Sequence, residues 1–261
     1  MTTHSHTTKK KASLNSSTAR KKPVQMQEKH SSHSVKKPVG QVIRKIPRAC
    51  QKSITQFYHR LTTKDVNRYV KDWKSLTPTT NPQQANRWKF AYCTIHTPWE
   101  RSCQQFEKIK GHYGQTELTT LRRALSSTNG GMHDLKSKAI HHFQLTWKNN
   151  ASLFKPTDNW QDFRDKLVTK LPGIGYAKTS FALEMIYPNE AECLCLDRHM
   201  LKACGWTDVD STVSKDQYRY YEDYWLDISK EYKVPPVISR NIYWDQIQQQ
   251  PNSFYWANSL T

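Results

Sequence analysis

Acidic residues and long apolar runs are both scarce in this chain of 261 residues. It contains 22 Asp and Glu against 40 Lys and Arg, which gives a formal net charge of +18. Hydrophobic residues make up 36%, a low share for this length, which indicates that part of the chain does not pack. No apolar run approaches the ~18 residues that are needed to cross a bilayer. We therefore expect a basic, soluble protein that does not bind a membrane.

The shortage of acids is greatest in residues 1–48, which also lack any aromatic residue. Twelve Lys and Arg against one acid, Glu28, give this segment a charge of +11. Because it cannot bury enough apolar surface to offset chain entropy, we predict a disordered tail. Its charge favours a nucleic-acid tether, since each neutralised phosphate releases counterions. The alternatives are a tail that only aids solubility and a targeting peptide, although lysine clusters without apolar periodicity disfavour an organelle transit peptide.

Metal-binding cysteine patterns and alternating strand patterns are also missing. The six cysteines are dispersed, and the spacing of Cys193, Cys195 and Cys204 matches no known zinc site. We expect reduced, mostly buried thiols, with no metal and no cofactor. Apolar residues instead recur at helical spacing, as in 88–95, 135–147 and 160–171, which predicts an all-α fold.

The C-terminal stretch from Tyr218 to Trp256 is rich in aromatic residues. Interleaved with arginines, such side chains could stack on bases. The helical spacing of Tyr218, Tyr221 and Trp225 favours the other interpretation, a core-facing side of a helix.

A glycine turn before a predicted helix is the most informative segment. Its residues are Leu171, Pro172, Gly173, Ile174, Gly175 and Tyr176. Without large side chains in the way, the amides of such a turn and the free N–H groups of the next helix can meet a phosphate oxygen. Lys178 follows the turn and Asp197 lies 19 residues further on. The pattern indicates a protein that holds a DNA backbone and attacks a sugar.

Together these motifs resemble the helix-hairpin-helix DNA glycosylase superfamily, which contains endonuclease III and the 8-oxoguanine glycosylases. Its signature is Leu-Pro-Gly-hydrophobic-Gly, then an apolar helix, then hydrophobic-Asp-x-His. Here these parts are residues 171–175, 181–186 and 196–199. The resemblance extends over about residues 86–206.

The resemblance implies two helical lobes that flank a DNA-binding cleft. Residues 85–204 would form the glycosylase core, and 52–84 with 205–261 the terminal lobe. Many relatives of endonuclease III hold an iron–sulfur cluster through four cysteines after the catalytic acid. Only Cys204 follows Asp197, so this cluster is not expected. A small, cluster-free chain with divergent flanks also resembles phage-encoded members.

Asp197 is, by this resemblance, the catalytic acid. Breaking a glycosidic bond places positive charge on the sugar, which a nearby carboxylate stabilises. An aspartate before a helix is more often a simple cap, but the two roles are compatible.

Lys178 is the candidate nucleophile. In lyase-active members a lysine attacks C1′ as a neutral amine, which requires a depressed pKa. The usual family position corresponds to Ala177, and one residue on a helix is a rotation of about 100°. One extra hairpin residue would instead align Lys178 and Thr179 with the family's Lys-Thr pair. Otherwise Lys178 pairs with a phosphate or a surface acid, and water is the nucleophile.

Further DNA contacts are expected at His96, Gly131, Lys138 and His199. His96 lies near the position of a Gln or Asn that fills the gap left by the everted base, unless it is an ordinary loop histidine. Gly131 and Lys138 belong to a segment that resembles a family turn leading into a helix along the cleft. A plain loop is the alternative, and Lys136 should be exposed in either case. His199 completes the Asp-x-His motif.

The leading hypothesis is a monomeric DNA repair glycosylase acting in an intracellular, DNA-containing compartment. It would flip a damaged or mismatched base out of double-stranded DNA and cleave the base–sugar bond, with strand cleavage if Lys178 is the nucleophile. The alternative is an architectural or packaging protein without chemistry. Asp197 separates the two hypotheses, because a carboxylate facing phosphates repels them and a binder does not need it. The lesion itself depends on pocket side chains from several helices.

Deletion of residues 1–48 should reduce the salt dependence of non-specific DNA binding, because fewer counterions are released. The measurement is the slope of log binding constant against log salt for an undamaged duplex. An unchanged slope would show that the tail does not touch DNA.

Overall fold

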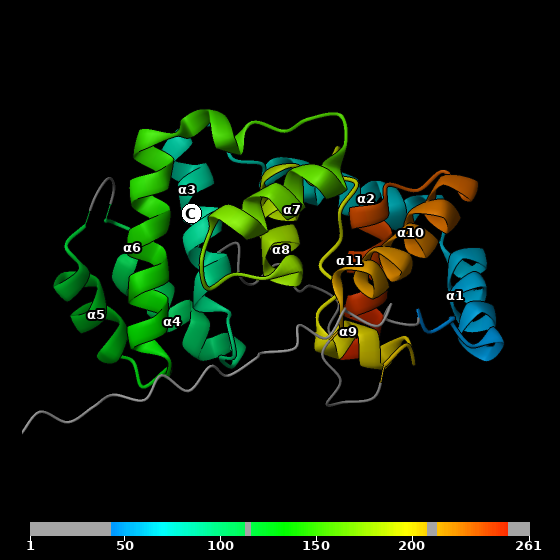
Figure 1. Ribbon diagram of the computed structural model, residues 1–261. Coiled ribbons are helices and arrows are strands. Elements are labelled where there is room, and N and C mark those ends of the chain that lie inside the picture. The colour runs from blue at the N-terminus through cyan, green and yellow to red at the C-terminus, as the bar shows by residue number, and fades with distance from the viewer. Residues whose placement is uncertain (1–42, 113–115, 208–212, 250–261) are drawn as a thin grey trace, which may run out of the picture. The chain divides into compact units, whose positions relative to one another are not determined.

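The computed structural model describes residues 43–112, 116–207 and 213–249, and these residues form helices and connecting turns without a β-strand (Figure 1). The helices are α1 (Arg48–Arg60), α2 (Thr63–Ser75), α3 (Asn81–Cys93), α4 (Trp99–Ile109), α5 (Leu118–Ser126), α6 (His133–Asn149), the 3₁₀-helix η1 (Ala151–Phe154), α7 (Trp160–Lys170), α8 (Tyr176–Ile186), α9 (Arg198–Ala203), α10 (Lys215–Glu231) and α11 (Pro236–Gln248). The predicted all-α fold is confirmed. None of these helices is both long and apolar enough to span a bilayer.

The helices pack in two groups. In the first group, α3 lies against α4, α6 and α8, while α5 packs on α4 and α6 and α7 packs on α8. In the second group, α11 lies against α2 and α10. Helix α1 joins the second group through Tyr58, whose hydroxyl lies 2.9 Å from that of Ser239 in α11 and also contacts Ser229 in α10. This group therefore combines helices from both ends of the described chain.

Short polar side chains set the starts of several helices. Thr62, Asn159 and Ser214 each accept a hydrogen bond from a backbone N–H in the first turn of the helix that follows. Thr80 forms a reciprocal capping box with Gln83 at the start of α3. These caps satisfy N–H groups that have no partner within the helix.

The segment before α1 is held against α10. The backbone N–H of Arg44 donates to Gln217 Oε1 at 2.6 Å, and Gln217 Nε2 donates to the Arg44 carbonyl at 2.9 Å. Ile46 is 3% exposed. Residues 44–46, which the sequence assigned to the tail, are therefore anchored. Residues 1–42 lie outside the described residues. A deletion that keeps the contacts of residues 44–46 should therefore remove residues 1–42 only.

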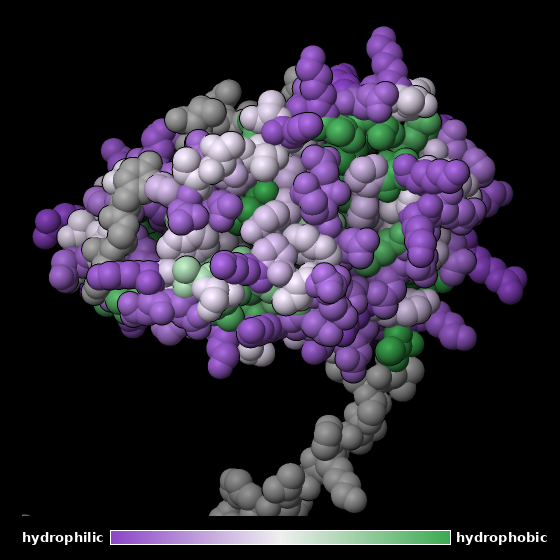
Figure 2. All heavy atoms as spheres, turned by 90° about the horizontal axis from the view of Figure 1, so that it is seen from above, coloured by the Kyte–Doolittle hydropathy of each residue, from purple (hydrophilic) through white to green (hydrophobic). Residues whose placement is uncertain are grey.

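The aromatic residues of α10 form part of the core. Tyr218, Tyr221 and Trp225 are all buried, and Trp225 packs edge-on against Tyr243 of α11. The core interpretation of their spacing is confirmed, while residues 254–256 lie outside the described residues. The face in Figure 2 is covered mostly by hydrophilic side chains, with hydrophobic atoms gathered in small patches.

Two buried ion pairs connect the groups. Glu184 of α8 is paired with Arg240 of α11, and Arg164 of α7 donates to Glu222 of α10 at 2.5 Å. The side chains of Glu184, Glu222 and Arg164 are completely buried, and Arg240 is 6% exposed. Charges in such positions are tolerated only when paired and hydrogen-bonded.

Replacing Arg240 by Met should destabilise the protein by about 3–5 kcal/mol, because Glu184 would be left as an uncompensated buried charge. Urea unfolding measures the change. The matched control is Arg68→Ala, which removes an arginine 54% exposed and paired with Asp65, and should change stability by less than about 1 kcal/mol. Equal effects of the two substitutions would contradict the assignment.

Candidate active site

The turn between α7 and α8 is anchored by its apolar residues and open at its glycines. Leu171 and Ile174 are buried, whereas Pro172, Gly173 and Gly175 are exposed. Tyr176 begins α8 and is half-buried. Gly175 stands at the N-cap of α8 and provides no side-chain cap. The first N–H groups of a helix have no partner within it, so those of α8 are available to an anion.

The two glycines have different physical roles. Gly173 has a φ of +77°, and a Cβ there would approach Cβ of Ala139 in α6 to 2.9 Å. Gly175 has a negative φ, and a Cβ there would meet nothing within 4 Å. The fold itself therefore requires Gly173, which allows the turn to pack on α6. Gly175 instead leaves the exposed side of the turn free of side-chain atoms, so that an anion can approach the backbone closely.

Lys178 and Asp197 form an ion pair beside this turn. The distance from Lys178 Nζ to Asp197 Oδ2 is 3.3 Å. Asp197 is the N-cap of α9, and its Oδ1 accepts a hydrogen bond from the Met200 N–H at 3.1 Å. The carboxylate thus caps the helix and pairs with the amine at the same time. Both side chains remain about one quarter exposed, at 25% and 24%. The turn places the amine at position 178, not position 177, opposite the acid.

The ion pair favours the charged forms of both groups. Burial opposes charge on Lys178, but the surrounding groups outweigh it and raise the pKa of Lys178. Burial raises the pKa of the neighbouring Cys195 thiol to about 12, so the carboxylate of Asp197 is the anion that matters at neutral pH. Burial also opposes charge on Asp197, but Lys178 and the Met200 N–H outweigh it and lower the pKa of Asp197. The amine is therefore protonated here, opposite to the depressed pKa that a lysine nucleophile requires.

His96 lies in the turn between α3 and α4. It is exposed, with a φ of +46°, a conformation that few non-glycine residues adopt. The next residue, Thr97, donates through Oγ1 to the carbonyl of Gly130 at 3.1 Å. The turn that carries His96 is thereby tied to the turn before α6, where Gly131 is exposed with a φ of +70°.

Lys136, expected to be exposed, is completely buried, so that prediction was wrong. Its Nζ donates to the Cys93 carbonyl at 2.6 Å, to Gln105 Oε1 at 2.7 Å and to Thr97 Oγ1. An amine in the first turn of α6 reaches the carboxyl end of α3, where free carbonyl groups need donors. Lys138, two residues on, is exposed.

The predicted site residues lie in two neighbouring groups. One surrounds the Lys178–Asp197 ion pair and the other lies at the start of α6. Lys178 and Asp197 are in contact, and the glycine turn packs on α6, which begins just after Gly131. His199 is exposed in the first turn of α9, next to the Asp197 cap. Within residues 43–112, 116–207 and 213–249, His96 forms no hydrogen bond with Lys178 or Asp197.

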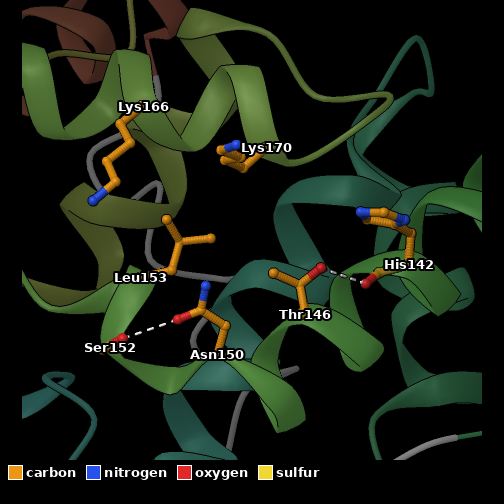
Figure 3. A pocket seen from close by; sticks show the side chains of 7 residues that line it. All are labelled: His142, Thr146, Asn150, Ser152, Leu153, Lys166 and Lys170. Carbon is orange, nitrogen blue, oxygen red and sulfur yellow. Dashed lines mark hydrogen bonds between the residues drawn. The ribbon is translucent and has the colours of Figure 1, made fainter.

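A separate cavity lies between the carboxyl-terminal half of α6, η1 and α7 (Figure 3). Its lining residues are His142, Thr146, Asn150, Ser152, Leu153, Lys166 and Lys170. It contains neither Asp197 nor Lys178, and its lining has no acid. This cavity is therefore not the candidate active site.

Comparison with solved structures finds this helical fold in 8-oxoguanine DNA glycosylases. The Methanocaldococcus jannaschii 8-oxoguanine DNA glycosylase has a TM-score of 0.64 and 18% identity, over 78% of this chain and 97% of that chain. The Methanocaldococcus jannaschii 8-oxoguanine glycosylase/lyase in complex with a 15mer DNA containing 8-oxoguanine has a TM-score of 0.63 and 16% identity, over 77% and 98%. The Thermotoga maritima 8-oxoguanine DNA glycosylase has a TM-score of 0.63 and 17% identity, over 78% and 100%.

No family model matches the sequence, and no curated protein matches it. At these identities the likeness to solved structures establishes the fold. The chain therefore shares the helical architecture of these glycosylases with little of their sequence.

Gly173→Ala should destabilise the protein by about 1–3 kcal/mol, because it combines a left-handed backbone with a contact against Ala139. Gly175→Ala, with open space at its Cβ, should change stability by less than about 1 kcal/mol. Thermal or urea unfolding of both variants is the measurement. A larger loss for Gly175→Ala would reverse the assigned roles.

Proposed function

We propose that this protein is a DNA glycosylase that releases a damaged or mismatched base from duplex DNA. The observation that carries the proposal is the Lys178–Asp197 pair, partly open to solvent beside an exposed glycine turn. The fold supports it, since the structural neighbours are 8-oxoguanine DNA glycosylases and one of them is in complex with DNA containing 8-oxoguanine.

The glycine turn supplies the hold on DNA in this proposal. The exposed residues Pro172, Gly173 and Gly175 and the free N–H groups of α8 bind a phosphate of the strand. Lys138, Gly131 and His199 are exposed and add contacts to the backbone, and His96 occupies the gap left by the flipped nucleotide. The net positive charge of the chain favours binding to DNA phosphates, whatever the base sequence.

Asp197 supplies the charge for bond cleavage. As the bond between C1′ and the base nitrogen breaks, the electron pair leaves with the base and positive charge develops on the sugar. An ionised carboxylate stabilises that charge, and its position is fixed because Oδ1 remains bound to the Met200 N–H. The lowered pKa keeps Asp197 ionised throughout the neutral range.

In the proposed lyase step, the Lys178 amine attacks C1′ of the sugar from which the base has been released, and water leaves as a Schiff base forms. Elimination of the 3′ phosphate from this Schiff base then breaks the strand. The amine must first lose a proton, and the nearest acceptor is Asp197 Oδ2 at 3.3 Å. Since the ion pair raises the pKa of Lys178, only a small fraction of the amine is neutral at pH 7. Release of the base by water is the faster route at this pH, and strand cleavage follows more slowly.

Asp197→Asn should reduce single-turnover base release by at least ~100-fold, while DNA affinity stays equal or improves slightly. Asparagine is also a good N-cap, so α9 should persist. A panel of duplexes, each with one damaged or mismatched base, provides the substrates and identifies the lesion. Asp216→Asn, at an exposed acid in the first turn of α10, is the matched control. Normal release by Asp197→Asn would remove this residue from the mechanism and favour the DNA-binding alternative.

Borohydride should trap a covalent adduct between Lys178 and lesion-containing DNA, and the trapping rate should rise from pH 7 to pH 9. The reason is the raised pKa, which keeps the amine protonated at the lower pH. Base release, which depends on ionised Asp197, should stay flat over the same range.

Lys178→Ala should abolish the adduct, and Lys148→Ala, at an exposed lysine near the end of α6, should not. An adduct that survives Lys178→Ala would show that another amine is the nucleophile. No adduct from the unchanged protein would leave an enzyme that uses water alone.

A further inference from the structure

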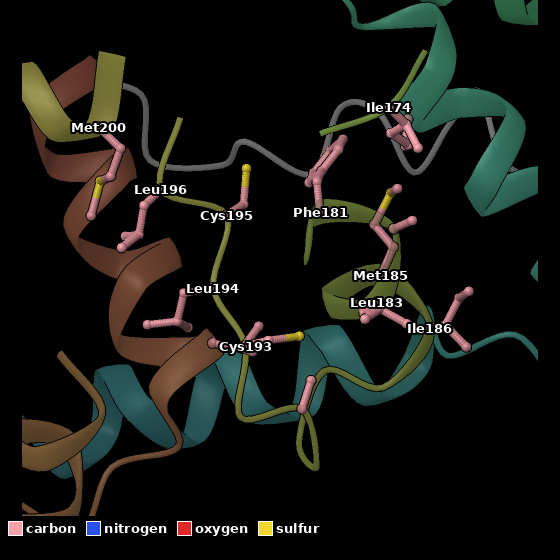
Figure 4. Close-up of a cluster of buried hydrophobic side chains, with 14 of the residues drawn as sticks. Ile174, Phe181, Leu183, Met185, Ile186, Cys193, Leu194, Cys195, Leu196 and Met200 are labelled. Carbon is pink, nitrogen blue, oxygen red and sulfur yellow. The ribbon is translucent and has the colours of Figure 1, made fainter. Parts of the chain in front are cut away.

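The segment that leads into Asp197 is buried, yet it belongs to no helix or sheet. Residues 193–196 are at most 5% exposed and run between α8 and helices of the second group (Figure 4). A buried backbone without a neighbouring strand must find other partners for its N–H groups. The path of this segment therefore depends on side chains from the surrounding helices.

Three consecutive N–H groups of the segment are bound by three buried side chains. Leu194 N donates to Glu222 Oε1 at 2.7 Å, and Cys195 N donates to Glu184 Oε1, also at 2.7 Å. Leu196 N, directly before Asp197, donates to the hydroxyl of Tyr218 at 3.0 Å and also to the Leu194 carbonyl at 3.0 Å. The same hydroxyl donates to the Leu194 carbonyl at 2.6 Å. Tyr218 thus takes the place of a neighbouring strand, with one bond accepted and one donated.

Tyr218 also contacts the glycine turn. Its ring lies 5.6 Å from the ring of Tyr176, the first residue of α8. The Arg164 guanidinium lies over both rings, 5.1 Å from the centre of Tyr218 and 5.3 Å from that of Tyr176. One side chain of α10 therefore contacts both elements that hold the ion pair, namely the start of α8, which carries Lys178, and the segment that ends at Asp197.

We infer that Tyr218 is a positioning residue, which sets the place of Asp197 relative to Lys178 and the sugar. The inference rests on the proposed function for its catalytic consequence, but the placement of the carboxylate can be measured without activity. Loss of the hydroxyl removes one partner each from the buried Leu196 N–H and Leu194 carbonyl, and leaves these groups with the hydrogen bond between them, at 3.0 Å. A shift of the segment then displaces Asp197, and a displacement of about 1 Å can lower a rate about 100-fold.

The test compares Tyr218→Phe with Tyr58→Phe. Tyr58 is also buried, and its hydroxyl also has two partners, but it lies in α1 and these partners are Ser229 in α10 and Ser239 in α11. Both variants should lose similar stability, and both are assayed at a temperature at which circular dichroism shows them folded. Tyr218→Phe should release the base about 10–100-fold more slowly in single turnover, with DNA affinity within about twofold. Tyr58→Phe should match the unchanged protein.

A carbon-13 NMR titration of the Asp197 carboxyl provides the measurement independent of catalysis. Displacement from Lys178 and from the Met200 N–H should raise the lowered pKa of Asp197 towards that of an ordinary aspartate in Tyr218→Phe, but not in Tyr58→Phe. Equal rates and equal titrations in the two variants would overturn the inference. If the unchanged protein releases no base while the Asp197 titration moves in Tyr218→Phe alone, the proposed function fails and the positioning role stands.

Discussion

The ion pair between Lys178 and Asp197 depends on two separate pieces of backbone geometry. The left-handed conformation at Gly173 lets the turn pack on α6, and this packing fixes the rotation of α8. The N-cap geometry of α9 fixes the other partner, because the Asp197 carboxylate is bound to the Met200 N–H. Moving either Lys178 or Asp197 by one position in the sequence would break the ion pair. The candidate chemistry is thus a consequence of how two helices begin.

Much of the fold could be predicted from the sequence, and so could the turn and the acid that make up the candidate site. Helical spacing predicted the all-α fold, and the turn from Leu171 to Gly175 with Asp197 indicated the candidate site, because glycine and N-cap positions have strict backbone requirements. The register of Lys178 could not be decided, since it depends on the path of the turn and not on spacing. The raised pKa of Lys178 was missed for a related reason, as it arises from contact with Asp197.

Buried charges were the residues that sequence patterns could not place. Lys136 was assigned to the surface, and Glu184 was read as part of an apolar helix, although both are completely buried. A single acid within Phe181–Ile186 was the only available signal. Its partner, Arg240, lies 56 residues away in another helix, so no local pattern could reveal the pair. The same holds for Tyr218, whose hydroxyl partners lie 22 and 24 residues away.

The hydrogen bonds of Lys136 have a consequence for the turn that carries His96. A protonated amine has three N–H bonds, and here all three acceptors are uncharged oxygens, those of Cys93, Thr97 and Gln105. Burial lowers the pKa of Lys136 to about 8, so mildly alkaline solution removes one of the three protons. A neutral amine can serve only two acceptors. At alkaline pH, one of the three hydrogen bonds of Lys136 would then be lost. The turn that carries His96 would become less firmly held, while the surrounding helices stay in place.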